Sequence, residues 1–165
     1  MEIVELTLID EYIEELSLLL KEVVDGGASI GFLPPLDILE AKEYWENVLA
    51  PDVRLFVAKV EDQIAGTVQL QLCTKSNGTH RAEIAKLMTS SNYRRMGIAR
   101  ALMEKAESVA TQEGRSLLVL DTREGDPSNL LYQSLGYIQA GKIPFFAQSA
   151  NGEFDATVLY YKRLA

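Results

Sequence analysis

The sequence predicts a mixed α/β fold with the element order β-α-α-β-β-β-α-β-α-β-β. Three observations support this prediction. Apolar residues recur at helical spacing in some segments, alternate with polar residues in others, and form a nearly continuous run in one more. Stretches that contain glycine and proline separate these segments. The length of 165 residues fits a single domain, which we expect to span residues 1–165.

The first half of the chain predicts two helices followed by three antiparallel strands. The stretch "DGGASIGFLPP" ends the first helix, because glycine and proline interrupt the helical pattern. A tight turn at "EDQ" joins the first two strands of the meander, and the Asn77-Gly78 pair favours a type I′ turn before the third. The expected ranges are 2–7 for a leading strand, 9–23 and 37–49 for the helices, and 54–60, 64–74 and 81–88 for the meander.

The second half predicts a crossover unit and a final hairpin. A helix over 97–113 ends at Gly114, which suits the C′ position. The apolar run "SLLVLDT" then predicts a strand buried on both faces, and the helical crossover makes it parallel to the strand before the helix. A short helix follows, with Asp126 as N-cap and Pro127 at its first position. The last two strands are expected on either side of the second Asn-Gly pair.

Composition argues against several functional classes. The chain has 24 acidic and 16 basic residues, a net charge of −8, which disfavours a nucleic-acid partner because phosphates repel a negative surface. No apolar run approaches the roughly 18 residues of a membrane span, and the acidic start "MEIVELTLIDEY" differs from a signal peptide. We therefore expect no membrane partner and a cytoplasmic location. One cysteine and one histidine predict no internal disulfide and no metal site.

An arginine-rich turn interrupts this acidic chain within "SSNYRRMGIARALMEKA". A helix begins there, and a helix N-terminus offers about four unpaired N–H groups and about half a positive charge. Gly97 has no side chain to block close approach, and Ala99 is small. The turn therefore predicts an anion site for a phosphate-bearing ligand. The alternative is a turn glycine before an amphipathic helix, with solvated arginines around it.

Two motifs on these elements resemble those of the GNAT superfamily of N-acetyltransferases. "RRMGIA" matches the signature R/Q-x-x-G-x-G/A through Arg94, Gly97 and Ala99. "LYQSLGY" is similar to the family's segment L-Y-x-x-x-G-F/Y, and the expected element order is also that of the family. The resemblance implies the GNAT fold, a mixed α/β fold with helices on both faces of a mostly antiparallel sheet that contains one splayed parallel strand pair.

The resemblance also implies acetyl coenzyme A as co-substrate, without a metal. In the family, the glycine-containing loop binds the pyrophosphate through backbone amides, and the splayed strand pairs with the pantetheine arm like an added strand. This sequence departs from the family at Gly125, where many members have Asn, and at Ser91 and Asn92, near which Pro is usual. The implied cofactor-binding residues are Leu87, Met88, Thr89, Arg94, Arg95, Met96, Gly97, Ile98, Ala99, Arg100 and Ser128.

Three residues are expected to carry the chemistry of acetyl transfer. The resemblance implies that Tyr132 protonates the departing thiolate; the alternative is a packed tyrosine whose hydroxyl has a structural partner. Glu83 and Asp121 are the candidate bases, directly or through water, because adjacent parallel strands bring them together and burial with mutual repulsion raises one pKa. Strand alternation predicts Glu83, Ala85 and Leu87 on one face. The alternative roles are a cross-sheet ion pair for Glu83 and a loop cap for Asp121.

The loop "DGGASIGF" is expected to shape the acceptor pocket through Gly26, Gly27 and Ser29, or else simply to end a helix. With "QLQLCTKSNG", "AEIAKLM" and "LDT" it loosely resembles the tabtoxin-resistance type of acetyltransferase, which implies a small-molecule amine acceptor. We therefore expect direct acetylation of a primary amine on an amino acid-like molecule, an amine metabolite or a toxin. Protein or peptide acetylation and a non-catalytic coenzyme A sensor are the alternatives. The segments "FFAQ" and "VLYY" either pair in a homodimer or belong to the core.

Overall fold

Seven strands, four α-helices and one 3₁₀ turn form the computed structural model, which describes residues 1–164. None of these helices is long and apolar enough to cross a lipid bilayer. The strands are β1 (Glu2–Leu6), β2 (Val53–Val60), β3 (Gln63–Leu72), β4 (Arg81–Thr89), β5 (Leu117–Arg123), β6 (Ile138–Gln148) and β7 (Phe154–Arg163). The helices are α1 (Ile13–Asp25), α2 (Ile38–Glu46), α3 (Ile98–Gln112) and α4 (Ser128–Ser134), with the 3₁₀ turn at Ser91–Tyr93.

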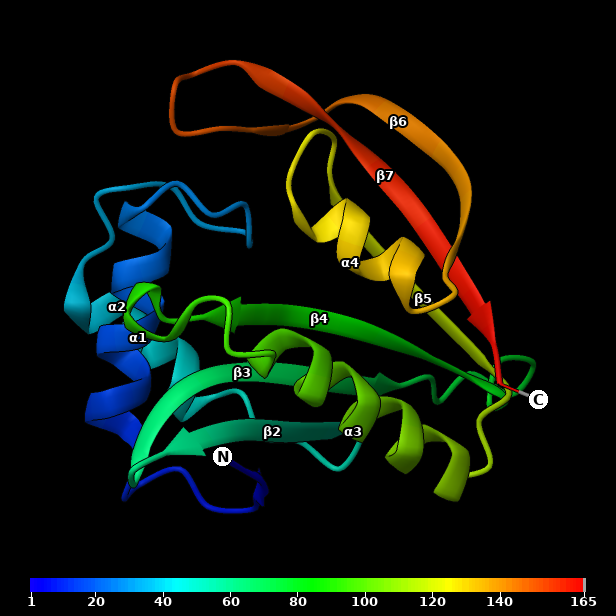
Figure 1. Ribbon diagram of the computed structural model, residues 1–165, viewed down its shortest axis with the longest axis horizontal. Coiled ribbons are helices and arrows are strands. Elements are labelled where there is room, and N and C mark those ends of the chain that lie inside the picture. Colours follow the sequence, from blue (N-terminus) through cyan, green and yellow to red (C-terminus); the bar gives the residue numbers. More distant parts are fainter. Residues whose placement is uncertain (165) are drawn as a thin grey trace.

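One sheet runs through the molecule in the strand order β1-β2-β3-β4-β5-β7-β6. Among the strands of residues 1–164 only β4 and β5 pair in parallel, as the crossover through α3 requires. Their pairing extends from Arg81 with Leu117 to Glu83 with Val119, and no further. Figure 1 shows the two strands diverging from their meeting point near the C terminus. The predicted element order and fold class, including the splayed parallel pair, are confirmed.

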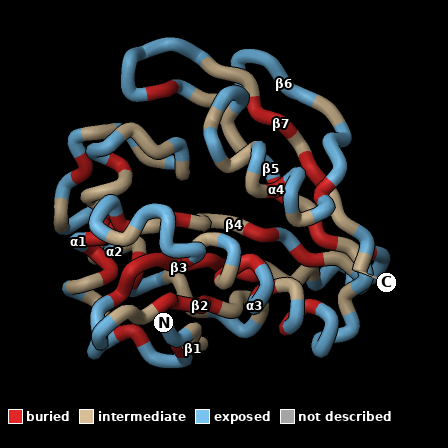
Figure 2. The backbone as a smooth tube through the Cα atoms, in the orientation of Figure 1, coloured by how far each residue is buried: buried red, intermediate tan, exposed pale blue. Residues whose placement is uncertain are grey.

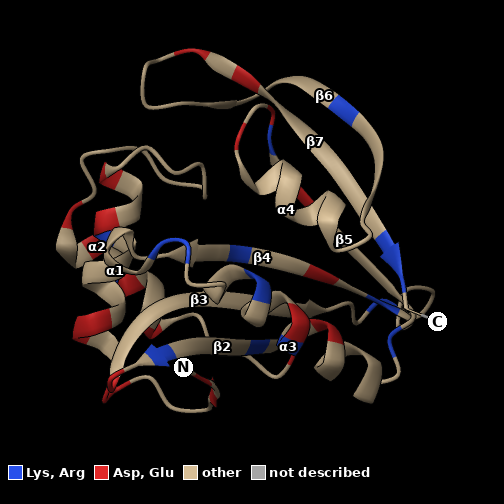
Figure 3. Ribbon diagram, viewed as in Figure 1, with Lys and Arg blue, Asp and Glu red and all other residues tan. Residues whose placement is uncertain are grey.

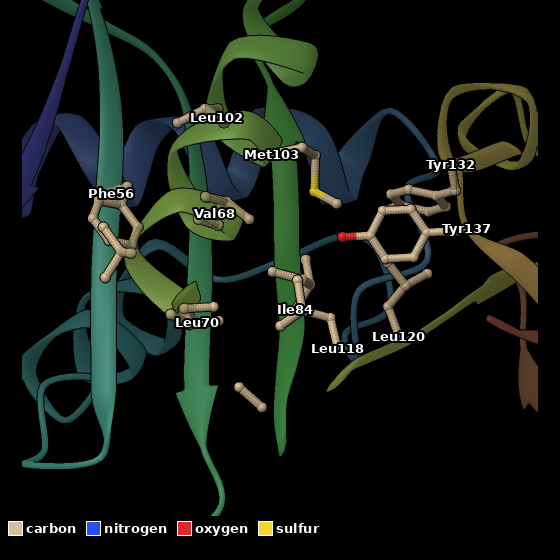
Figure 4. Packing of buried hydrophobic residues seen from close by; sticks show 14 of the residues in the cluster. Phe56, Val68, Leu70, Ile84, Leu102, Met103, Leu118, Leu120, Tyr132 and Tyr137 are labelled. Carbon is tan, nitrogen blue, oxygen red and sulfur yellow. The ribbon is translucent and has the colours of Figure 1, made fainter. Parts of the chain in front are cut away.

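Helices cover both faces of the sheet, and each face has its own buried core (Figure 2). Neighbouring β2 residues divide between the two cores, since Phe56 packs on the α3 side while Leu55 and Val57 pack with α1 and α2. Figure 4 shows the α3-side core extending from Phe56 on β2 to Tyr132 and Tyr137 at its other end. This core therefore joins the two halves of the sheet on one face, although the strands separate.

A β-bulge interrupts β4 at Lys86. The register between β3 and β4 shifts between Thr67, which faces Met88, and Gln69, which faces Ala85, so that β4 has one extra residue. Lys86 has a φ of +54°, a left-handed conformation that a non-glycine residue rarely adopts. A bulge bends its strand and turns its side chains to new directions. β4 thus bends soon after its pairing with β5 has ended.

The hairpin turns differ from the sequence prediction in one place. Glu61 and Asp62 in the "EDQ" turn both have positive φ, at +51° and +64°, as a two-residue primed turn requires. The predicted type I′ turn at Asn77-Gly78 is wrong, because neither residue has a positive φ. Gly78 lies in a crowded place instead, since a Cβ there would be 2.6 Å from Nη1 of Arg81 and 2.7 Å from Sγ of Cys73.

Two further local predictions are wrong in the second half of the chain. Gly114 ends α3 with a φ of +76°, as expected. Asp126, however, does not cap α4, because its carboxylate accepts a hydrogen bond from Arg123 Nε at 3.0 Å. β5 is buried on its α3 side only, and its other face, which carries Asp121, is open.

The strand β6 forms one edge of the sheet and is exposed along its length. Phe145 is 79% exposed and Phe146 52%, so the burial alternative for "FFAQ" is wrong. In "VLYY", by contrast, Val158 and Tyr160 are buried in the α3-side core. Pro144 fits this position, because an edge strand tolerates a missing N–H donor.

Gly66 on β3 is expected to be essential for stability. A Cβ at this position would lie 2.7 Å from the Met88 carbonyl oxygen and 3.0 Å from Cγ2 of Ile98. Gly66→Ala should lower the free energy of unfolding by about 1–3 kcal/mol in urea denaturation, the usual cost of overpacking a core. Gly141→Ala is the control, since a Cβ there meets nothing within 4 Å. Equal effects of the two substitutions would contradict this packing account.

Candidate active site

The divergence of β4 and β5 opens onto a cavity of about 920 Å³. Its walls also include the α1–α2 loop, the start of α4 and the β6–β7 hairpin, and Figure 1 shows that loop and that hairpin facing each other. Among the residues predicted to bind the cofactor, residues 95–100 do not line this cavity. The predicted site residues that line the cavity are Gly26, Gly27, Ser29, Glu83, Leu87, Met88, Thr89, Arg94, Asp121, Ser128 and Tyr132.

The bulge decides which β4 side chains face the cavity. Glu83 and Ala85 lie before it and line the cavity, as alternation predicts. The bulge residue Lys86 also lines the cavity, Leu87 contacts the α3-side core, and Met88 is buried against α1 and α2. The predicted faces are therefore wrong beyond Ala85, because one extra residue reverses the alternation. Sequence reasoning also missed Lys86, since no local pattern identifies a bulge at a lysine.

Glu83 and Asp121 lie where β4 and β5 begin to separate, and solvent reaches both side chains. Partial burial in the cavity wall, and then the charge of Asp121, raise the pKa of Glu83 above its ordinary value of 4.5, while the Lys86 ammonium opposes the shift. Thr157 orients Asp121 by donating a hydrogen bond from Oγ1 to Oδ2 at 2.7 Å. Within residues 1–164 Glu83 forms no ion pair, so the cross-sheet pair proposed as its alternative role is not observed.

Tyr132 places a buried phenol at the cavity wall. Its ring packs against Tyr137 and Tyr160, with ring centroids 5.9 and 6.0 Å away, and the side chain is 6% exposed. In the part of the chain that the structure describes, the hydroxyl has no hydrogen-bond partner. Burial, and then the charge of Asp121, raise the pKa of Tyr132, so the phenol keeps its proton at neutral pH. A protonated hydroxyl without a structural partner is available to a ligand.

The turn before α3 has the backbone conformation of an anion-binding cradle. Arg95 and Gly97 are both left-handed, with φ of +63° and +75°, and no side chain caps the helix N-terminus. A Cβ at Gly97 would meet no atom within 4 Å, so there is room for a phosphate group. The arginines differ in role. Arg94 and Arg95 are exposed, whereas Arg100 donates to Oγ of Ser134 at 2.7 Å and connects α3 to α4.

Arg123 connects three walls of the cavity. Its guanidinium donates to the Gly27 carbonyl oxygen at 3.0 Å, to Ser149 Oγ at 3.1 Å and to the Asp126 carboxylate at 3.0 Å. These partners belong to the α1–α2 loop, the β6–β7 hairpin and the β5–α4 loop. Sequence reasoning missed Arg123 because its partners are distant along the chain. Its position directly after "LDT", at the carboxyl end of a strand, was the one available signal.

Hydroxyl contacts order both ends of the cavity. Ser128 Oγ, in the first turn of α4, lies 2.6 Å from Thr122 Oγ1 at the end of β5. At the other end, Glu22 on α1 accepts hydrogen bonds from the Ser91 hydroxyl at 3.0 Å and the Ser90 hydroxyl at 3.3 Å. The 3₁₀ turn that leads to α3 is thereby fixed to α1. Among residues 1–164, no group of three or more His, Cys, Asp or Glu side chains is arranged to hold a metal ion.

Comparison with known proteins identifies the family of this chain. The profile of the acetyltransferase (GNAT) family matches residues 22–137, more than half of the sequence. The chain belongs to this family. An uncharacterized N-acetyltransferase in the hisH-hisA intergenic region of Azospirillum brasilense is 31% identical over 106 residues, which cover 62% of this chain and 63% of that protein. Human N-acetyltransferase 8 is 30% identical over 135 residues, which cover 71% of this chain and 60% of that protein. The chain thus spans about three fifths of these relatives.

Solved structures share the fold of this GNAT chain. Ribosomal-protein-alanine N-acetyltransferase from Brucella melitensis matches with a TM-score of 0.84 and 20% identity, over 99% of this chain and 100% of that chain. An aminoglycoside 6′-N-acetyltransferase complexed with coenzyme A matches with a TM-score of 0.78 and 18% identity, over 99% of this chain and 97% of that chain. At these identities the likeness concerns the arrangement of the helices and the splayed sheet.

Gly97 is expected to matter more for coenzyme A binding than any single arginine. Gly97→Val should weaken binding in isothermal titration by roughly tenfold to hundredfold, because a side chain would fill the space in front of backbone donors to a charged group. Arg94→Ala or Arg95→Ala should weaken binding by less than about fivefold, since both side chains are solvated.

Gly114→Val is the matched control for this experiment. Gly114 lies at the opposite end of α3, has a φ of +76° and would also meet nothing within 4 Å. Valine at residue 114 therefore imposes backbone strain similar to that of valine at residue 97, but away from the turn before α3. Larger losses from the arginine variants than from Gly97→Val would show that side-chain charge is the main anchor.

Proposed function

We propose that this protein is an acetyl coenzyme A-dependent N-acetyltransferase that acts on the primary amine of a small molecule. The observation that carries the proposal is one cavity lined by Glu83, Asp121 and Tyr132 at the point where β4 and β5 separate. A carboxylate can accept the proton of the amine and a protonated phenol can donate one to the departing thiolate, so the cavity offers both proton transfers of acetyl transfer. Membership of the GNAT family supports the reaction class.

The proposed reaction is direct transfer without an acyl-enzyme. An alkyl ammonium with a pKa near 10 has no lone pair, so Glu83 or Asp121 first takes a proton from it, directly or through water. The raised pKa of Glu83 brings it closer to neutral pH, which suits a general base. The amine nitrogen bonds to the thioester carbonyl carbon and releases its second proton to solvent, the carbon–sulfur bond breaks, and Tyr132 gives its proton to the departing sulfur. The products are the N-acetyl amine and free coenzyme A, and the proton on the carboxylate returns to the phenolate through solvent.

Two features of the backbone fit acetyl coenzyme A. The N-terminus of α3 has space and free amides for the pyrophosphate. On β4, the Ser90 N–H bonds the Ala65 carbonyl of β3 at 2.8 Å, so ladder alternation turns the backbone groups of Thr89 toward β5. No β5 residue pairs with them. This edge suits the pantetheine arm as an added strand, and an amide within residues 87–89 is the proposed donor to the thioester oxygen.

A small acceptor is favoured over a protein because Arg123 holds the α1–α2 loop against β5 and narrows the acceptor side of the cavity. The proposed acceptor is an amino acid-like amine, an amine metabolite or a toxin. Structural relatives named for a ribosomal-protein alanine and for an aminoglycoside share the fold, so the fold itself does not choose between these classes. A cytoplasmic location and a homodimer formed through the exposed edge strand β6 belong to the same proposal.

The proposed function is tested by following thiol release from acetyl coenzyme A with a panel of amines, amino acid analogues and peptides. Turnover with small amines is the expected result. Turnover with peptides alone would make protein or peptide acetylation the function. Tight binding of coenzyme A without thiol release in the presence of any acceptor would identify a sensor and overturn the proposal.

Tyr132→Phe is expected to lower kcat by about 10²–10⁴, the usual contribution of a positioned acid, with little change in coenzyme A affinity. Tyr137→Phe is the matched control, because Tyr137 is equally buried and packs on the same ring, but its hydroxyl bonds Glu107 and not the cavity. The measurement is the kcat of each variant in steady-state kinetics, relative to the wild-type protein. Unchanged turnover in Tyr132→Phe would exclude the acid role.

The acidic limb of the pH dependence of kcat/KM is expected to reflect the titration of the Glu83 carboxyl group. Because its pKa is raised, kcat/KM calculated on free amine should rise through a pKa above 4.5. Asp121→Asn removes a charge that raises this pKa, so the limb should move to lower pH. Glu83→Gln should abolish the limb and most of the activity. If instead Asp121→Asn abolished activity and Glu83→Gln kept both the rate and the limb, Asp121 would be the base.

A further inference from the structure

We infer that Lys86 is a recognition site for a carboxylate that the acceptor carries in addition to its amine. The inference rests on the proposed acetyl transfer and narrows its acceptor to a zwitterionic, amino acid-like class. It depends on three features of the cavity: the strained bulge that directs Lys86, the free donors of its ammonium, and the two carboxylates nearby.

The bulge is what brings Lys86 to the cavity. In a regular strand, residue 86 would lie on the same face as Ile84, which is 4% exposed in the α3-side core. The left-handed conformation at Lys86 directs the side chain to the opposite face instead, where it lines the cavity. Unfavourable backbone conformations of this kind concentrate at functional sites, where the surrounding structure maintains them.

The ammonium of Lys86 is near acidic groups but is bound to none of them. Within residues 1–164 it forms no salt bridge and no side-chain hydrogen bond. Burial lowers the pKa of Lys86 below its ordinary value of 10.5, while Asp121 and then Glu83 oppose this shift by stabilising the ammonium through space. Its Nζ lies against the α1–α2 loop, since a Cβ on Gly31 would be 3.2 Å away. Of the arginines that line the same cavity, Arg123 already binds three partners, and Arg94 is exposed just before the turn that leads to α3. Lys86 therefore has all its donors available to an anionic ligand.

The charges around Lys86 match an acceptor with two opposite charges. The ammonium of the acceptor is attracted to Glu83 and Asp121, and its carboxylate is attracted to Lys86. Figure 3 shows β4 carrying its acidic and basic segments in succession along the splayed strand. Glu83 and Lys86 are separated by about 10 Å of strand at most, so their side chains can converge on a molecule of amino acid size. A plain monoamine would leave the half-buried Lys86 ammonium without a partner.

The experiment compares α-, β- and γ-amino acids with their carboxamides as acetyl acceptors, at matched concentrations of free amine. Each pair differs only in the carboxylate. Wild-type protein is expected to have a kcat/KM roughly tenfold to hundredfold higher for the acids, the range of a hydrogen bond between charged groups. Lys86→Met should remove that preference: at a pH above the acidic limb, where loss of the Lys86 charge does not change the protonation of Glu83, kcat/KM should fall for the acids far more than for the carboxamides. Lys86→Arg should restore part of the preference.

Lys75→Met is the matched control, because Lys75 is exposed and lies outside the cavity lining. Coenzyme A affinity of each variant shows that the cofactor site is intact. Equal losses of Lys86→Met on acids and carboxamides would assign Lys86 to catalysis or structure and overturn the inference. A wild-type preference for carboxamides, or none at all, would also overturn it. Absence of thiol release with every amine would instead contradict the proposed acetyl transfer itself.

Discussion

The pairing of β4 and β5 ends after Glu83 and Val119, and the rest of the site depends on that limit. Unpaired backbone groups inside a sheet are costly unless a ligand or water satisfies them. The α3-side core tolerates the opening because it continues beneath both strands, from Phe56 to Tyr132. On the opposite face Asp121 is exposed, and it lines a cavity together with the end of β4. The bulge at Lys86 bends β4 at the same place.

The opened sheet is held by a few polar contacts between its two halves. Arg100 joins α3 to α4 through Ser134, and Arg123 joins the β5 side to the α1–α2 loop through Gly27. Basic and acidic side chains also lie at different places in the cavity. Exposed Arg94 lies toward the α3 cradle, where the proposed pyrophosphate binds, while the carboxylates lie where the proposed amine binds. Opposite local potentials in one cavity suit two substrates of opposite charge, although the chain as a whole has a net charge of −8.

The sequence predicted those features that depend on local pattern or on connectivity. Helical spacing, alternation and the crossover were sufficient for the element order and the parallel pair, and the glycine at residue 97 indicated the turn before α3. The features it missed depend on register or on contacts distant in sequence. The bulge at Lys86 is a mismatch between two strands, and the partners of Arg123 come from three separate loops. The type I′ turn expected at Asn77-Gly78 is wrong because neither residue has a positive φ, and Gly78 is instead crowded by the side chains of Arg81 and Cys73.

Hydrogen exchange at two neighbouring amides tests most directly whether the splayed edge of β4 is the ligand-binding strand. Ladder alternation turns the Met88 amide toward β3 and the Thr89 amide toward the gap. In the free protein, Met88 should therefore exchange slowly and Thr89 quickly. Saturating coenzyme A should slow exchange at Thr89 by about tenfold or more and change Met88 little. A Thr89 amide that is already protected in the free protein, or one that coenzyme A leaves unchanged, would contradict this account of the site.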